Sequence, residues 1–109
     1  MADDYLGEFE HLVLLAVMQL GDEAYGVPIR SLITERAERE VSFGAVYSTL
    51  RRLDAKGYVT FREEASAGAA GGRPRRIALA TDAGERAVSA AQRRLRRMTT
   101  ALAPGETSR

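Results

Sequence analysis

Cysteine and tryptophan are absent from this 109-residue chain, and histidine occurs once, as His11. Without cysteine the chain can form neither a disulfide nor a thiolate metal site, and we expect no metal and no cofactor. The longest apolar run, Leu12 to Met18, is far shorter than the ~20 residues of a membrane-spanning helix. The acidic first residues lack the basic stretch of a secretory signal, so we expect a cytoplasmic protein without a membrane partner.

Residue patterns common in enzymes are missing as well. The chain has no phosphate-binding glycine loop, no nucleophile elbow and no histidine cluster. The adjacent carboxylates Asp3–Asp4 and Glu63–Glu64 are more typical of solvated ends than of acid–base pairs. His11 lies in an apolar segment, which favours a core or interface position, although titration near neutral pH stays open. We therefore expect no enzymatic activity.

Charge is distributed unevenly along the chain. Residues 1–24 carry six acidic and no basic residues, whereas residues 73–97 carry eight arginines against Asp82 and Glu85. All but one of the 16 basic residues are arginine, a bias that GC-rich coding can also produce. The concentration of positive charge in one segment nevertheless suggests a surface that binds a polyanion.

Three helices are predicted in the first half of the chain. Residues 8–20 are apolar on nearly every side, so part of this helix is expected to meet another subunit. Tyr25–Pro28 opens a second helix, with proline tolerated in its first turn. Ser42 is a good N-cap for a third helix that reaches about Lys56 and stops at Gly57.

A hairpin and a last helix follow. Residues 58–62 are β-branched and aromatic and predict a strand, and residues 75–80 predict a second, weaker one. Between them the stretch AGAAGGRPRR at 67–76 places small residues beside three arginines, which indicates a mobile hairpin tip rather than a plain linker. Thr81 caps a helix whose apolar residues recur at spacings of three and four, a pattern typical of helices that pair.

Three helices followed by a two-stranded hairpin are the layout of a winged helix-turn-helix domain. The chain resembles the PadR family of bacterial transcriptional regulators in YGVPI at 25–29, GAVYSTLRRLDAKGYV at 44–59, GGRPRR at 71–76 and TDAG at 81–84. The resemblance covers about residues 8–100. It implies a homodimeric repressor whose third helix enters the major groove and whose wing touches flanking DNA. It fits the short members, which have a single C-terminal dimerisation helix.

The expected fold is mainly α-helical with a small β-hairpin. Residues 1–80 form the winged helix-turn-helix domain, residues 81–103 the dimerisation helix and residues 104–109 a disordered tail. The residues expected to contact DNA are Tyr25, Ser42, Gly44, Tyr47, Ser48, Arg51, Arg52, Arg73, Arg75 and Arg76. The residues expected at the dimer interface are Phe9, Leu12, Leu15, Val88, Ala91, Leu95, Met98 and Leu102.

The expected function is sequence-specific binding of double-stranded DNA by a homodimeric repressor on a palindromic operator. A small-molecule effector, if one acts on the protein, is expected between the subunits in a pocket lined by Leu15, Ala91, Leu95 and Met98. The last helix contains no aromatic residue, so stacking of flat ligands there is not expected. The alternative is a winged-helix module that binds protein instead of DNA.

Overall fold

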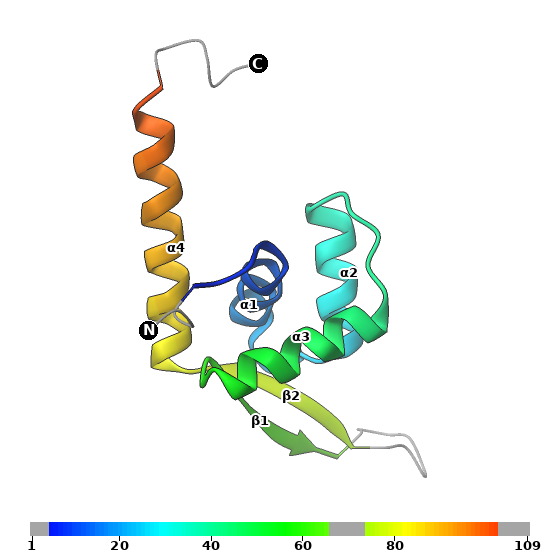
Figure 1. Ribbon diagram of the computed structural model, residues 1–109. Helices are drawn as coiled ribbons and strands as arrows, with labels where there is room; N and C mark the ends of the chain where they lie inside the picture. Colours follow the sequence, from blue (N-terminus) through cyan, green and yellow to red (C-terminus); the bar gives the residue numbers. More distant parts are fainter. Residues whose placement is uncertain (1–4, 66–73, 103–109) are drawn as a thin grey trace.

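The computed structural model describes residues 5–65 and 74–102 (Figure 1). Along this part of the chain the elements are α1 (Glu8–Leu20), the 3-10 turn η2 (Gly21–Glu23), α2 (Gly26–Arg36), α3 (Phe43–Ala55), β1 (Val59–Glu64), β2 (Arg75–Ala80) and α4 (Asp82–Thr100). The predicted winged-helix order is confirmed. The expected tail, the tip of the hairpin and Arg73 lie outside the described residues.

Helices begin and end where local residues dictate. Gly21 ends α1 with a φ of 57°, and Gly57 follows α3 with a φ of 80°, backbone conformations that favour glycine. The Ser42 and Thr81 hydroxyl oxygens each accept a hydrogen bond from the amide three residues later, at 3.1 and 3.0 Å. These bonds satisfy amides that have no partner inside the helix, so they mark the starts of α3 and α4.

Strands β1 and β2 form an antiparallel hairpin in which Val59 pairs with Ala80 and Glu64 with Arg75. Strand β1 starts one residue later than predicted and ends two residues later, because pairing with β2 decides its length. The amide of Ala78 donates a hydrogen bond to the Ala24 carbonyl at 2.8 Å, which ties β2 to the segment before α2. The hairpin is therefore attached to the helical body along one edge.

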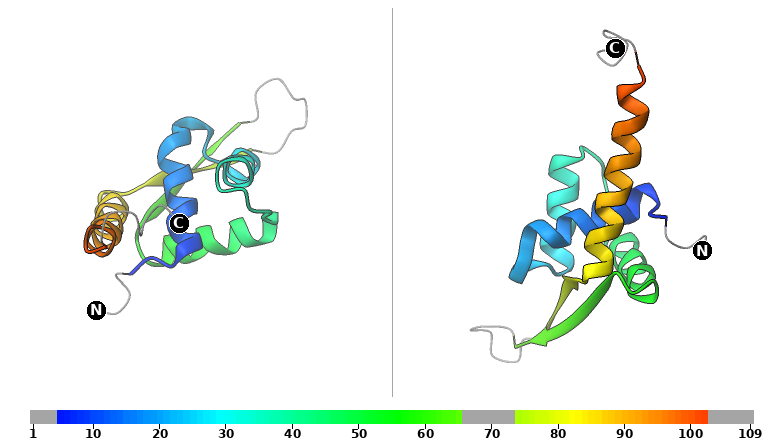
Figure 2. Two further views of the ribbon diagram at one scale, coloured as in Figure 1. Left: turned by 90° about the horizontal axis from the view of Figure 1, so that it is seen from above. Right: turned by 90° about the vertical axis from the view of Figure 1, so that its left-hand side faces the viewer.

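Helix α1 lies at the centre of the molecule and contacts α2, α3, α4 and β2 (Figures 1 and 2). Val13, Leu14 and Val17 of α1 are buried. The apolar character of α1 on nearly every side is thus satisfied largely within one chain, and a second subunit is not needed to explain most of it.

Helix α4 starts against the helical body and then leaves it (Figure 2). Thr81 donates two hydrogen bonds into the turn before β1, from its amide to the Tyr58 carbonyl at 3.0 Å and from its hydroxyl to the Gly57 carbonyl at 2.7 Å. A side chain at Gly84 would collide with the Tyr58 carbonyl, so glycine permits this close approach. Beyond Ala91 every described residue of α4 is exposed. No helix in the described segments is long and apolar enough to cross a membrane.

Candidate nucleic-acid interface

Helix α3 separates a buried face from an exposed face. Val46, Thr49 and Leu53 are buried against the core. Gly44 and Arg51 are exposed on the other side, and the Arg51 side chain forms no hydrogen bond or ion pair with the described residues. The exposed face therefore combines a backbone that can be approached closely with a free guanidinium group.

Tyr47 and Ser48 lie beside these residues. Tyr47 is 49% exposed, and it packs on the start of α2 so closely that a Cβ at Gly26 would overlap its hydroxyl. The Ser48 hydroxyl donates a hydrogen bond to the Gly44 carbonyl at 2.8 Å, which leaves its lone pairs as acceptors. The missing side chain at Gly26 thus lets α2 and α3 meet and holds the Tyr47 ring in place.

Arg52, which helical spacing assigns to the same side as Arg51, turns toward α1. Its Nε lies 3.4 Å from Oε2 of Glu10, and its Nη2 donates a hydrogen bond to Oγ1 of Thr49 at 3.1 Å. The side chain is still more than half exposed. Arg52 therefore already has partners within the chain, whereas Arg51 has none among the described residues.

Glu10 is the acidic centre of this junction, and the sequence analysis missed it. It is 8% exposed and accepts hydrogen bonds from Nζ of Lys56 at 2.8 Å and from the amide of Gly7 at 2.9 Å. Lys56 also donates to the Tyr5 carbonyl at 3.0 Å. Burial by itself raises the pKa of Glu10, but the bonds from Lys56, Gly7 and Arg52 outweigh it and hold the pKa below its ordinary value. An ionised Glu10 therefore ties the end of α3 to α1.

Arginines at the start of β2, beside the tip of the hairpin, lie against aromatic rings. The guanidinium carbon of Arg75 is 5.0 Å from the centre of the Tyr25 ring, and that of Arg76 is 4.1 Å from the centre of the Phe61 ring. Nη1 of Arg75 also lies 3.9 Å from Oε1 of Glu23. Stacking of this kind orients a guanidinium group without neutralising it. Tyr25, predicted to contact DNA, therefore also positions Arg75.

Acidic residues of η2 and β1 face the hairpin arginines. Nη2 of Arg62 lies 3.3 Å from Oδ1 of Asp22 and 3.0 Å from Oε2 of Glu64. Exposed pairs of this type add little to stability. They do reduce the positive potential of the hairpin, so the number of arginines overstates the attraction of the hairpin for a polyanion.

The order of helices and strands, the exposed face of α3 and the arginine-bearing hairpin are those of a winged helix-turn-helix protein. The model of the transcriptional regulator PadR-like family matches residues 14–90 of this chain. The chain belongs to the PadR-like family. No curated protein sequence matches it.

Solved structures show the fold of this PadR-like protein in related chains. A PadR family transcription regulator from Clostridium difficile R20291 has a TM-score of 0.73 at 20% identity, over 87% of this chain and 94% of that one. A PadR-like transcription factor from Bacteroides fragilis has a TM-score of 0.65 at 25% identity, over 87% of this chain and 89% of that one. Bacillus subtilis PadR, solved in complex with operator DNA, has a TM-score of 0.63 at 19% identity, over 74% of this chain and 44% of that one.

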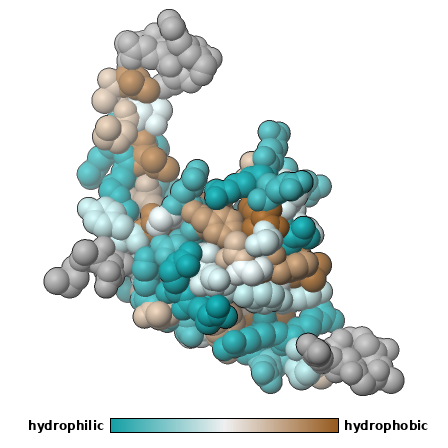
Figure 3. Space-filling view, turned by 45° about the vertical axis from the view of Figure 1, so that its right-hand side comes forward, coloured by the Kyte–Doolittle hydropathy of each residue, from teal (hydrophilic) through white to brown (hydrophobic). Residues whose placement is uncertain are grey.

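The apolar seam of α4 divides into two parts in this PadR-like protein. Val88 and Ala91 are buried within the protomer, whereas Leu95 is 61% and Met98 72% exposed on the part of α4 that leaves the body. Brown, apolar atoms are visible along this part of the helix (Figure 3). Of the other residues expected at the interface, Leu102 is exposed, and Phe9, Leu12 and Leu15 are partly buried.

A cavity of about 440 Å³ lies where the N-terminal segment and α1 face α4. Of the four residues expected to line an effector pocket, Ala91 and Leu95 line this cavity, and Leu15 and Met98 do not. The complete lining is Tyr5, Leu6, Glu8, His11, Ala91, Arg94 and Leu95.

His11 reaches the same cavity. Burial lowers the pKa of its imidazole, and the positive charge of Arg94 lowers it further, so the ring is neutral at neutral pH. Among the described residues Nε2 of His11 has no hydrogen-bond partner. His11 is partly buried and faces α4 across this cavity, and its expected core or interface position stays a prediction.

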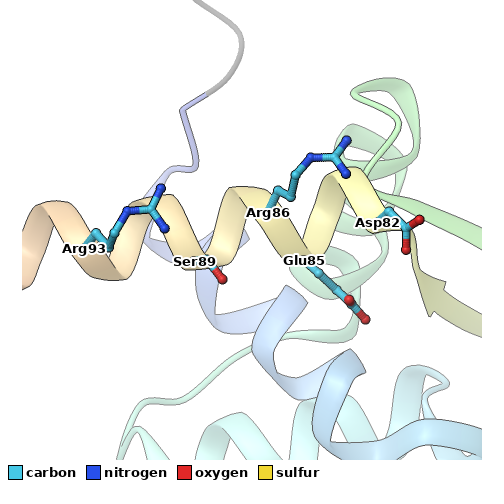
Figure 4. A pocket seen from close by; sticks show the side chains of 5 residues that line it. All are labelled: Asp82, Glu85, Arg86, Ser89 and Arg93. Atoms are coloured by element: carbon cyan, nitrogen blue, oxygen red, sulfur yellow. The ribbon is translucent and has the colours of Figure 1, made fainter.

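A further hollow of about 520 Å³ runs along α4 (Figure 4). Its lining residues all come from this one helix, and Glu85 and Arg86 point to different sides of it. The charged groups therefore do not converge on one point, as a catalytic site would require. Within the described segments no group of three or more histidine, aspartate or glutamate side chains could hold a metal ion.

Proposed function

We propose that this PadR-like protein is a DNA-binding repressor that acts as a homodimer on a palindromic operator. The observation that carries the proposal is the exposed face of α3, with Gly44, Tyr47, Ser48 and Arg51, next to a hairpin whose arginines are oriented by aromatic rings. A recognition helix of this kind reads base edges while the surrounding side chains hold phosphates. Such a regulator acts where bacterial DNA is, in the cytoplasm.

Each residue on α3 has a role that its geometry supports. Arg51 is unpaired among the described residues and takes guanine edges or a phosphate. Ser48 uses its proton within the helix, so it accepts from an adenine or cytosine amino group. The Tyr47 ring is held by its contact with Gly26, and its hydroxyl donates a hydrogen bond to a phosphate. Ser42 caps α3 and acts through the orientation of the helix.

The hairpin supplies affinity that depends little on sequence. The guanidinium groups of Arg75 and Arg76 lie over the rings of Tyr25 and Phe61, and they can contact the phosphates of the DNA backbone while keeping or leaving these rings. Arg73, which precedes them in the sequence, would add a third arginine to these contacts. Phosphate contacts made by such arginines release counterions, so affinity falls as salt rises.

Dimerisation uses the part of α4 that leaves the body. Leu95 and Met98 lie on its exposed surface, and Leu102 follows just after its last residue, Thr100. The three are spaced as in a heptad repeat, and a second α4 would cover them. With 19 residues α4 is about 28 Å long, which suits the separation of two half-sites one helical turn apart. A small-molecule effector would bind in the cavity beside Ala91 and Leu95, next to this interface.

The test is binding to an operator selected from random-sequence duplex DNA, measured by fluorescence anisotropy in the presence of non-specific competitor. Arg51→Ala should weaken binding to this operator roughly 5- to 150-fold, the value of one specific base contact. Arg93→Ala is the matched control, because it removes the same charge from α4, and it should leave operator affinity nearly unchanged. If no sequence is selected at all, or if Arg51→Ala binds normally, the alternative of a protein-binding module is favoured.

A further inference from the structure

An exposed aromatic ring stands at the first position of α3. Phe43 is 41% exposed, although a phenylalanine gains most from burial. Several other large apolar side chains are exposed among the described residues. The exposure of Leu95 and Met98 on α4 is explained by the proposed dimer interface. Phe43 belongs neither to the core nor to the proposed dimer interface, so its exposure needs a separate explanation.

The ring is held in a defined orientation. The guanidinium carbon of Arg30, on α2, lies 4.6 Å from the centre of the Phe43 ring. Arg30 is itself anchored, because its Nε donates a hydrogen bond to the Val41 carbonyl at 2.6 Å, just before α3. One face of the ring is therefore covered by a fixed cation, and part of the side chain is presented to the outside.

Phe43 also stands in line with the residues proposed to meet DNA. Phe43, Tyr47 and Arg51 follow one another at intervals of four along α3, and all three are exposed. The N-terminal residues of a recognition helix are those that contact base edges in the major groove. Arg30 covers one face of the ring, and Arg51 lies about two turns further along α3 in the same line, so the exposed row carries positive charge at both ends, which suits a phosphate-lined groove better than an apolar protein surface.

The major groove offers one apolar feature, the 5-methyl group of thymine. We propose that Phe43 is a specificity-determining residue that contacts a thymine methyl group in each half of the operator. The proposal rests on the proposed DNA-binding function and adds the kind of base that the start of α3 selects. Arg30 is then a positioning residue, which holds the ring at the angle from which it meets the methyl group.

The experiment compares thymine with deoxyuridine, which differs only by the missing methyl group. Each thymine of one half of the selected operator is replaced singly by deoxyuridine, and the dissociation constant is measured at fixed salt. With the unsubstituted protein one such replacement should weaken binding about fourfold, the value of one buried methyl group. With Phe43→Ala the same replacement should have no effect, while Phe43→Leu should keep part of the penalty.

Met18→Ala is the matched control, because Met18 is 40% exposed and lies on α1. It should retain the full penalty for the missing methyl group. Phe43 lies outside the core and is 41% exposed, so both of its variants should stay folded with only a small loss in Tm, which circular dichroism verifies.

Three outcomes would overturn the inference. The first is a penalty of equal size in Phe43→Ala and the unsubstituted protein, and the second is an operator in which no thymine is sensitive to loss of its methyl group. In both, the proposed DNA-binding function stands and only the role of Phe43 fails. The third is the absence of any preferred operator, which refutes the proposed function together with this inference.

Discussion

Replacing Glu10 by glutamine tests how α3 is attached to the rest of the protein. The change keeps the size of the side chain and removes one negative charge from the junction between α1 and the end of α3. Glu10 accepts bonds from Lys56 at 2.8 Å, from the Gly7 amide at 2.9 Å and from Arg52 at 3.4 Å. All three donors would face a neutral amide in the variant.

The size of the effect follows from these contacts. A hydrogen bond to a charged group contributes about 1.5–3 kcal/mol when it is shielded from water. The Arg52 side chain is more than half exposed and adds little, and Lys56, which is partly exposed, regains water when the charge is lost. The side-chain carbonyl oxygen of the introduced glutamine still accepts one bond. We therefore expect Glu10→Gln to lower the free energy of unfolding by about 1–2 kcal/mol.

Thermal unfolding followed by circular dichroism measures this loss, which should lower Tm by about 5–10 °C for a domain of this size. Glu8→Gln is the control, because Glu8 lies on the same helix but pairs with Arg39 at 3.6 Å in an exposed position. It should leave Tm nearly unchanged. A double-mutant cycle with Lys56→Gln should show coupling between Glu10 and Lys56. Equal Tm values for Glu10→Gln and Glu8→Gln would refute the reasoning.

The contribution of Glu10 should also depend on pH in one direction. Its folded-state pKa is below its unfolded-state value, so its stabilisation is complete above the unfolded-state pKa. The stabilisation is lost as pH falls through the lower, folded-state pKa. The Tm values of the unsubstituted protein and of Glu10→Gln should therefore converge in acid. A difference that stays constant from neutral to acidic pH would show that shape, not charge, is responsible.

Three further predictions concern α4, α2 and the hairpin. Leu95→Asp should sediment as a folded monomer, because Leu95 is exposed in the protomer and its loss does not disturb the core. The control Gln92→Asp should remain dimeric, and a dimeric Leu95→Asp would exclude the proposed α4 interface. Gly26→Ala should destabilise the fold by about 1 kcal/mol, the low end of the cost of overpacking, because its Cβ overlaps the end of the half-exposed Tyr47 side chain, which can turn away; Tyr47→Ala should restore part of the loss in a melting experiment. Arg75→Ala should reduce the salt dependence of operator binding by about one unit of slope, and an unchanged slope would mean that Arg75 does not contact phosphate.

Much of the secondary structure can be predicted because its causes are local. Ser42 and Thr81 cap the helices that follow them, and Gly21 and Gly57 end the helices before them, through bonds and dihedral angles that involve only neighbouring residues. Strand β1 marks the limit of this reasoning. Its last residue is decided by its pairing with β2, which lies on the other side of the hairpin tip.

The candidate site divides in the same way. Helical spacing places Arg51 and Arg52 on one side of α3, and only tertiary packing separates them, because Arg52 meets Glu10, a residue 42 positions away. Two features of the sequence point to this junction. Glu10 is a carboxylate in a mostly apolar helix, and Lys56 is the single lysine of the chain. A buried carboxylate needs a partner, but spacing alone does not say which cation supplies it.

The amino-acid sequence by itself determined the order of the elements, the ends of the helices and the motifs that mark the PadR-like family. These depend on contacts between residues a few positions apart, whose geometry the backbone dictates. The tertiary structure decided which apolar residues of α4 are buried at Val88 and Ala91 and which are left exposed at Leu95 and Met98. It also decided that Arg30 holds the Phe43 ring. Burial and pairing of this kind depend on where distant segments meet. The spacing of apolar residues along a helix is the same whether or not another element covers them, so the spacing alone does not show which of them are buried.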